Sequence, residues 1–342
     1  MRSTIKDIAK ATGLSLTTVS LVLNNKPNRI PQATRDVVLK TAKELNYRPS
    51  HIAISMVTKK TSTIGLVLPD ISNLYFSELA KVIETQFHQH GYNVLLGNTN
   101  DSIERDFDYL NLFFERNVDA AIIVLSTQFK EKEKDYLYHM MKDDNIPIVV
   151  LDRCMDDDRF LSVTLDQKLG GYLATNYLIK LGHKKIGCIT GPHCLISATS
   201  RLEGYKSALL EANIPFDKAL VYEGDFHVTS GTKALPYLLG QNVTAVFCAN
   251  DMMAIGIYRE SRRYHLSLPD DLSIVGFDDI FIDEFLEPPL TTIAQPADKI
   301  GMEAVRLILS ILNGNPLTAK DSVVFKPILK VRGSAAKYVE SQ

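Results

Sequence analysis

Cysteine is scarce in this sequence: the 342 residues include four, Cys154, Cys188, Cys194 and Cys248. None of them forms the Cys-x-x-Cys pair that is typical of structural zinc sites and of dithiol redox centres. Four scattered cysteines are also too few for the disulfide scaffold that holds small secreted domains together. The sequence therefore predicts neither a metal centre nor a thiol redox site.

Long hydrophobic runs are missing as well. No apolar stretch approaches the roughly 20 residues that a helix needs to cross a bilayer. The first residues, MRSTIKDIAK, lack the apolar region and the small-residue cleavage site of a secretory signal. We therefore expect a cytoplasmic protein without a membrane partner. At roughly 150 residues per domain, a chain of this length predicts two or three domains.

Sequence motifs of common enzyme classes are also absent. The chain contains no GxxxxGK[ST] phosphate loop, no GxSxG nucleophile turn and no HExxH zinc motif. We therefore expect a protein that is not an enzyme, with no catalytic residue, no metal ligand and no cofactor.

Acidic residues are rare at the amino-terminal end of the chain. Residues 1–60 hold eleven Lys or Arg against three Asp or Glu, a net charge of +8, whereas the remaining residues hold 27 bases and 37 acids, a net charge of −10. A basic module attached to an acidic remainder favours binding of a polyanion such as DNA by one end of the chain.

The stretch TIKDIAKATGLSLTTVSLVLNN, residues 4–25, predicts two short helices joined by a tight turn. Thr4 can cap the first helix, with Asp7 in its first turn, and Gly13 can end that helix in a left-handed conformation. Ser15 can then cap the second helix. Its inward face is Val19, Val22 and Leu23, and its outer face carries hydroxyl side chains. Short polar side chains at a helix start, in a basic module, suit contacts to phosphates and base edges.

A third helix is expected over residues 32–46, after Pro31, with Val38, Ala42 and Leu45 facing inward. The sequence therefore predicts a helix-turn-helix domain over residues 1–48. Residues 49–61 follow as a linker, because Pro49 blocks continuation of the third helix. This linker contains a short apolar stretch, which is too short to form a stable helix alone.

The opening stretch, together with ELNYRPSHIA at residues 44–53, resembles the amino-terminal module of the LacI/GalR family of bacterial transcriptional regulators. In that family the second helix enters the major groove. Leu21 stands where many members carry Arg or His, so we expect an apolar base contact there. The resemblance implies DNA contacts for Thr4, Ser15, Leu16, Thr17, Thr18, Ser20, Leu21, Asn24, Arg29, Tyr47, Ala53 and Met56.

The linker resembles the hinge helix of this family, which forms on DNA and pairs with the hinge of a second subunit. Met56 falls at the position of the apolar side chain that wedges into the minor groove and kinks the duplex. The resemblance therefore implies a homodimer that binds a pseudo-palindromic, double-stranded DNA operator.

From Thr63 onward, short β-branched runs alternate with amphipathic helical stretches. The runs cover residues 64–69, 92–98, 120–125, 147–152, 185–191, 244–250 and 273–278. Apolar strands alternating with helices predict an α/β fold with parallel sheets that are covered on both faces. We expect two doubly wound subdomains, the first over about 62–162 and 292–322 and the second over about 163–291 and 323–334. This arrangement resembles the periplasmic-binding-protein fold.

Polar and aromatic side chains follow the predicted strands at their carboxyl ends, where open α/β sheets bind ligands. Two aspartates against two arginines leave no surplus positive charge for a phosphate, and aromatic faces suit the C–H side of a sugar. The sequence predicts a site for a neutral polyol. Its predicted residues are Asn73, Tyr75, Phe76, Asp152, Arg153, Arg201, Phe226, Asn250, Asp278 and Gln295.

Most of this set is similar to the residues around D-ribose in ribose-binding proteins of this fold, and GPH, RLEGY, EGDF and PPLTTIAQP resemble stretches of ribose operon repressors. The resemblance implies a transcriptional repressor controlled by ribose. Three alternatives remain open. These are control by another sugar or a purine, control by a protein corepressor, and a transport-type sugar receptor without DNA binding.

Overall fold

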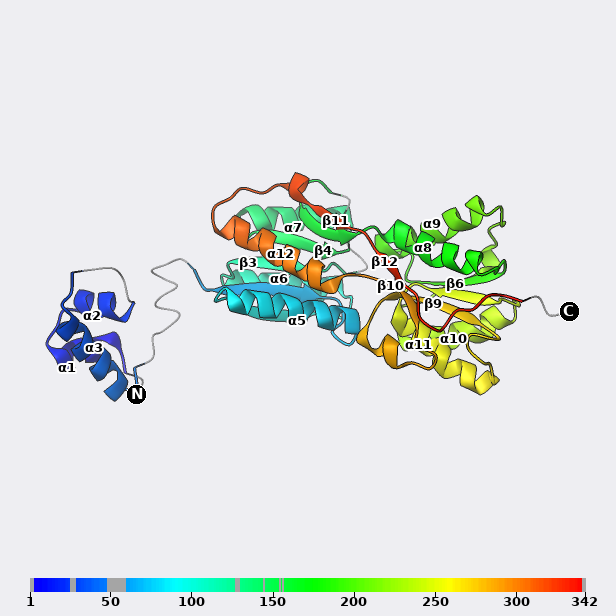
Figure 1. Cartoon of the computed structure of the whole chain (residues 1–342). Coiled ribbons are helices and arrows are strands. Elements are labelled where there is room, and N and C mark those ends of the chain that lie inside the picture. Colours follow the sequence, from blue (N-terminus) through cyan, green and yellow to red (C-terminus); the bar gives the residue numbers. More distant parts are fainter. Residues whose placement is uncertain are drawn as a thin grey trace. The chain divides into compact units, whose positions relative to one another are not determined.

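A computed structural model of the protein describes residues 3–24, 29–47, 60–126, 130–143, 145–153, 155 and 157–339. The chain forms two compact units, Met1–Thr61 and Ser62–Gln342. The first unit carries the helices α1 (Ile5–Thr12), α2 (Leu16–Leu23) and α3 (Gln32–Glu44) (Figure 1). These are the three helices that the sequence predicts.

Local hydrogen bonds define the two helix starts in the first unit. The Asp7 carboxylate accepts hydrogen bonds from the backbone N–H of Thr4 at 2.7 Å and from its hydroxyl at 2.8 Å. Gly13 ends α1 with φ of 67°, a conformation that side chains with a Cβ disfavour. The Ser15 hydroxyl then caps α2 by accepting from the N–H of Thr18 at 3.1 Å. The helix-turn-helix geometry is therefore encoded locally.

The second unit contains two six-stranded sheets (Figure 1). The first is entirely parallel, in the order β2 (Asn93–Asn98), β1 (Thr63–Leu68), β3 (Ala120–Ile123), β4 (Ile148–Asp152), β5 (Leu161–Leu165), β11 (Val323–Phe325). The second runs β7 (Val221–Glu223), β6 (Ile186–Thr190), β8 (Ala245–Cys248), β9 (Ser273–Asp278), β10 (Thr291–Ala294), β12 (Ile328–Lys330). Only β12 is antiparallel to its neighbour there. The predicted α/β fold with two doubly wound subdomains is confirmed.

Helices cover both faces of each sheet. In the first subdomain, α5 (Leu74–Gln89) and α12 (Ala297–Leu312) pack on one face, and α6 (Ile103–Glu115) and α7 (Glu131–Asp143) pack on the other. In the second, α8 (Gln167–Lys180) and α9 (Ile196–Glu211) oppose α10 (Val228–Leu239) and α11 (Asp251–Ser261). Short 3₁₀ turns lie at Lys218–Leu220, Arg262–Tyr264, Phe281–Phe285 and Ala319–Asp321.

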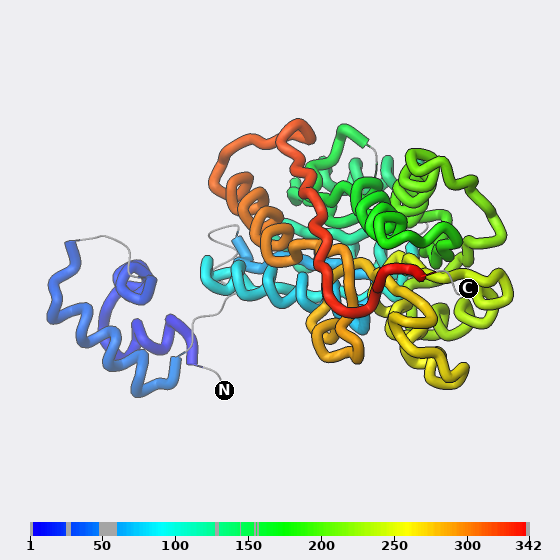
Figure 2. Tube along the Cα trace, turned by 45° about the vertical axis from the view of Figure 1, so that its right-hand side comes forward, coloured from blue at the N-terminus to red at the C-terminus, as the bar shows by residue number. Residues whose placement is uncertain are grey.

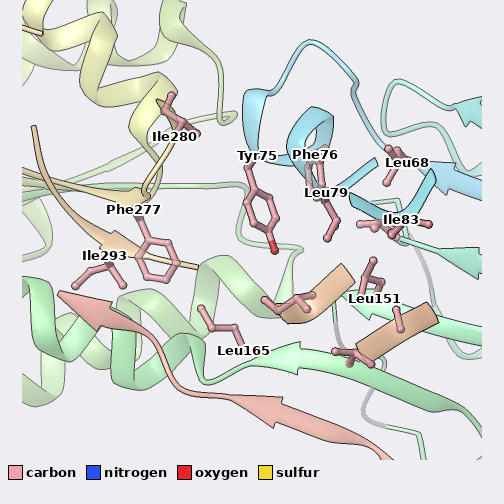
Figure 3. Close-up of a cluster of buried hydrophobic side chains, with 14 of the residues drawn as sticks. Leu68, Tyr75, Phe76, Leu79, Ile83, Leu151, Leu165, Phe277, Ile280 and Ile293 are labelled. Carbon is pink, nitrogen blue, oxygen red and sulfur yellow. The ribbon is translucent and has the colours of Figure 1, made fainter. Parts of the chain in front are cut away.

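Alternating strand residues enter different cores, which explains why the strands are apolar throughout. In β4, Val149 and Leu151 join the core under α5 and α12, whereas Ile148 and Val150 join the core under α6 and α7. Such two-sided burial requires continuous apolar sequence. One of these cores extends across both subdomains, and Figure 3 shows Tyr75 between residues of the first subdomain and Phe277 of the second.

The last strands differ from the predicted partition of the chain. Residues 323–334 were expected in the second subdomain, but β11 pairs with β5 of the first sheet and only β12 joins the second. Likewise, β10 belongs to the second sheet although residues 292–322 were expected in the first subdomain. Pro327 separates β11 from β12, and because proline has no N–H to donate to a ladder, the chain leaves one sheet there. Figure 2 shows this red segment crossing between the subdomains.

Neither β5 nor β7 is among the strands predicted from the sequence. β5 alternates apolar residues with Ser162 and Thr164, and β7 is only three residues long, so neither forms a continuous apolar run. Among the residues that the structure describes, no helix is long and apolar enough to cross a membrane, and no cluster of His, Cys, Asp and Glu is arranged to hold a metal ion.

Candidate DNA-binding face and effector cavity

Ten of the twelve predicted DNA-contacting residues lie in the part of the chain that the structure describes, and all ten belong to the first unit. Six of them are exposed: Thr4, Ser15, Leu16, Thr17, Asn24 and Arg29. Thr18, Ser20, Leu21 and Tyr47 are partly buried. Ala53 and Met56, the predicted hinge residues, lie outside the described residues.

The small core of the first unit determines which face of α2 is free. Val19 and Val22 are buried against Ile8 of α1 and Val38 of α3. Leu16, by contrast, keeps 46% of its surface exposed at the start of the helix. The face of α2 that does not enter the core is therefore the one that carries the predicted DNA contacts.

Hydrogen bonds within α2 orient several of its polar side chains. The hydroxyls of Ser15 and Thr18 lie 2.8 Å apart, and the Asn24 amide donates to the carbonyl of Ser20 at 2.9 Å and to its hydroxyl at 3.2 Å. These side chains retain further donors and acceptors, because a hydroxyl and an amide each offer more than one.

In the second unit, all ten predicted effector residues line a single cavity. The cavity is small: it holds about 290 Å³ of empty space, part of it open to solvent. Its residues come from the start of α5, from α9, and from the carboxyl ends of β4, β7, β8, β9 and β10 or the loops after them. Sequence reasoning missed one lining residue, Ser197, which lies one helical turn before Arg201 on α9.

Arg201 is the central cation of this cavity. It is 4% exposed, and its guanidinium lies 3.7 Å from the centre of the Phe277 ring and 4.0 Å from the Asp278 carboxylate. Its Nε donates to Gln167 at 2.7 Å, and its Nη1 donates to the carbonyl of Ala249. Burial lowers the pKa of Arg201, and the carboxylates of Asp278 and Asp152 oppose that shift. These contacts hold a rigid donor at the cavity wall.

Two buried carboxyl groups face the same cavity from opposite subdomains. Asp278 accepts a hydrogen bond from the Gln295 amide at 2.6 Å, and the Tyr75 hydroxyl lies 3.5 Å from Asp152. Burial raises the pKa of Asp278 well above its ordinary value and raises that of Asp152, while Arg201 counteracts both shifts. Burial also raises the pKa of Tyr75, so this residue is a neutral hydroxyl. The cavity therefore offers hydrogen-bonding groups of both kinds.

Three lining residues adopt a positive φ: Asp152 at 62°, Phe226 at 67° and Asp278 at 130°. Such conformations are unfavourable for residues with a Cβ and gather at functional sites. Phe226 also depends on Gly191, where a Cβ would lie 2.0 Å from the Phe226 ring. The Asn250 amide, in turn, donates to the Phe226 carbonyl at 2.9 Å. The aromatic wall is thus positioned by specific backbone contacts.

Arg153 also lines the cavity, but contacts within the protein already occupy much of its guanidinium. It is 6% exposed, its Nη1 pairs with Asp101 and also donates to the Leu125 carbonyl at 2.8 Å, and its guanidinium lies 5.7 Å from the centre of the Phe76 ring. Because Asp101 neutralises this arginine, the cavity has no surplus of positive charge.

Comparisons with known proteins agree with this architecture. Residues 4–50 match the family described as bacterial regulatory proteins, lacI family, and residues 175–335 match a periplasmic binding protein-like domain. The HTH-type transcriptional repressor PurR of Vibrio atlanticus is 36% identical over 309 residues, which cover 90% of this chain and 91% of that protein. The chain belongs to the lacI family. As in that family, it is a DNA-binding transcriptional regulator.

Solved structures of family members show the same architecture. The lac repressor dimer bound to operator and the anti-inducer ONPF superposes with a TM-score of 0.88 at 26% identity, over 98% of this chain and all of that one. A LacI family regulator from Enterococcus faecium with bound ribose gives a TM-score of 0.73 at 31% identity, over 81% of this chain and all of that one.

Proposed function

We propose that this lacI-family protein is a repressor that binds a pseudo-palindromic operator as a homodimer and is controlled by a small neutral sugar of the D-ribose class. The convergence of ten sequence-predicted residues on one small cavity carries this proposal. The relative from Enterococcus faecium that was solved with bound ribose supports the choice of a pentose.

The charges around the cavity favour a neutral ligand. Asp152 and Asp278 balance Arg201 and Arg153, and Arg153 already has Asp101 as its partner. A phosphate would need additional cations, whereas a polyol can donate to the carboxylates and accept from Arg201 and the Asn250 amide. The rings of Phe76 and Phe226 supply apolar surface for the C–H groups of a sugar.

The position of the cavity between two subdomains suggests how the sugar acts. Asn73, Phe76 and Asp152 belong to the first subdomain, whereas Arg201, Phe226 and Asp278 belong to the second. A ligand that contacts both sides stabilises one relative position of the subdomains more than another, and this difference in affinity couples to operator binding. We propose induction, in which the free protein binds the operator and the sugar releases it.

An operator titration of the full-length protein, with and without D-ribose, tests this proposal. We expect ribose to weaken operator binding at least tenfold, and Asp278→Ala to bind operator normally without responding to ribose. D-Xylose, adenine and hypoxanthine serve as comparison ligands. If wild type responds to a purine and ignores ribose, the sugar proposal is wrong. If Asp278→Ala responds as wild type does, the assignment of the cavity is wrong.

A further inference from the structure

A second cavity adjoins the effector cavity where the chain crosses from the first subdomain to the second. We call it the crossover groove. It holds about 610 Å³ of empty space, part of it open to solvent. Two of its residues, Asp152 and Ser197, also line the effector cavity, so the two spaces meet at these side chains. Its other lining residues are Thr164, Leu165, Asp166, Gln167, Lys168, Ile196, Ser200 and Val324.

One wall of the groove is a row of residues on three neighbouring strands. Asp152 of β4 pairs in register with Thr164 of β5, and Thr164 pairs with Val324 of β11. Neighbouring strands lie about 4.8 Å apart, so this row extends roughly 10 Å from the sugar-facing carboxyl group. The row leads from the effector cavity along the sheet into the groove.

The opposite wall is helix α9. Ser197 and Arg201, four residues apart, line the effector cavity. Ile196 and Ser200, also four residues apart, line the groove together with Ser197. Residues at this spacing share one side of a helix. Adjacent sides of α9 therefore line the two spaces, and a ligand could contact both.

The chemistry of the groove selects a neutral polar group. The buried Gln167 accepts from Arg201 through Oε1, but its Nε2 has no hydrogen-bond partner within the described part of the chain, so its two N–H donors are left unused. Asp152 and Asp166 outnumber Lys168, which disfavours a phosphate. Ile196 and Val324 keep 46% and 62% of their surfaces exposed and provide apolar contact. Hydroxyls and carboxylates beside apolar surface suit a neutral ring with its own donors and acceptors.

We propose that the effector is a pentose joined to a second neutral ring, and that the crossover groove binds this second ring. This inference rests on the proposed sugar-binding function and specifies its ligand class. A second sugar and a nucleobase share the required chemistry. The full-length protein is therefore titrated by calorimetry with D-ribose, a ribosyl disaccharide, uridine and ribose 5-phosphate.

We expect the disaccharide or uridine to bind at least about tenfold more tightly than ribose, a difference of about 1.4 kcal/mol. Ser200→Tyr should obstruct the groove and bring that affinity ratio close to one. Ile196→Ser should lower the ratio by removing exposed apolar surface, with little risk to folding. Leu210→Ser is the matched control, because Leu210 lies on the same helix, is 78% exposed and does not line either cavity.

The outcomes separate the two proposals. If ribose binds and both pentosides bind no more tightly, the groove proposal is wrong and the ribose proposal stands. If Ser200→Tyr and Ile196→Ser leave the ratio of pentoside affinity to ribose affinity unchanged, the groove proposal is also wrong. It is wrong as well if ribose 5-phosphate binds most tightly. If no pentose compound binds, the proposed function itself fails.

Discussion

The carboxyl groups of Asp251 and Asp283 are buried neighbours, and the charge of Asp251 helps to raise the pKa of Asp283. Both side chains are fully buried, and burial together with the neighbouring Asp251 charge raises the pKa of Asp283 to about 11. Protonated Asp283 can then donate a hydrogen bond to Asp251, which also accepts from the Thr292 hydroxyl and from the N–H of Asp279, both at 2.7 Å. Asp251 thus holds the backbone immediately after the cavity residue Asp278.

Asp283→Asn should preserve this arrangement, because an amide is also a neutral donor. Asp283→Ala should destabilise the protein by about 1–3 kcal/mol, since Asp251 loses a buried partner.

Native Asp283 keeps its proton up to a pH of about 11, whereas the unfolded residue loses it near 3.9. Stability should therefore fall with rising pH, by up to about 1.4 kcal/mol per unit, and Asp283→Asn should remove this contribution. Urea unfolding at pH 7 and 9 measures both effects. Equal pH slopes in wild type and Asp283→Asn would contradict the raised pKa of Asp283.

Asp106 should make the unfolding free energy depend on pH only in the acidic range. Burial raises its pKa to about 6, and its Oδ2 accepts from the N–H of Ser126 while its Oδ1 has no partner in the described structure. The native state therefore binds more protons than the unfolded state between about pH 4 and 6. The unfolding free energy should fall by up to about 3 kcal/mol as the pH rises across that interval.

We expect Asp106→Asn to make the slope of the unfolding free energy between pH 4 and 6 less steep, with the contribution of Asp283 remaining, and to leave the slope above pH 7 unchanged. Urea unfolding over both intervals measures this. Asp283→Asn is the internal comparison, because it should alter the slope in both. A wild-type slope between pH 4 and 6 in Asp106→Asn would show that this carboxyl group ionises normally.

Arg201→Lys should lower both the stability of the protein and its affinity for ribose. Lysine replaces the planar fork that donates to Gln167 and to the Ala249 carbonyl with a single ammonium group, and it cannot stack flat on Phe277. We expect a loss of about 2–4 kcal/mol in unfolding free energy and at least tenfold weaker ribose binding. Arg306→Lys, in an exposed pair with Glu303, is the control and should change neither quantity measurably. Ribose binding by Arg201→Lys at wild-type affinity would remove this residue from the site.

Leu16→Ala should weaken operator binding without lowering stability, because Leu16 is 46% exposed on the free face of α2. Leu39, on α3, is 51% exposed and is not among the predicted contacts, so Leu39→Ala is the matched control. Operator titration and thermal unfolding of both variants separate a DNA contact from a folding effect. Equal operator affinities in the two variants would count against major-groove contact by Leu16.

Operator affinity should fall steeply with salt, because residues 1–60 carry a net charge of +8 and must displace counterions from phosphates. With five or more phosphate contacts, the logarithm of affinity should fall with a slope steeper than about −4 against the logarithm of salt concentration. Fluorescence titrations between 50 and 200 mM salt, about the range over which this effect is large, measure the slope. A nearly flat dependence would mean that the basic unit does not contact the backbone.

Much of this architecture can be predicted from the sequence because it depends on contacts between residues that are close together in the chain. Thr4, Asp7, Gly13 and Ser15 define two helices through contacts within a few residues, and the alternation of apolar strands with helices identifies the parallel sheets. In such sheets the carboxyl ends of the strands meet at one edge, so the sequence alone assigns the residues after each strand to one cavity.

Other features depend on contacts between distant segments. Tertiary structure decided that β11 and β12 join different sheets, because short strands carry little pattern and their partners lie far away in sequence. It likewise decided that Ser197 faces the cavity, that Asp283 meets Asp251, and that Asp152, Thr164 and Val324 form one row. Sequence therefore determined the elements and the chemistry at their ends, whereas pairing and burial, which depend on three-dimensional packing, determined which side chains lie together.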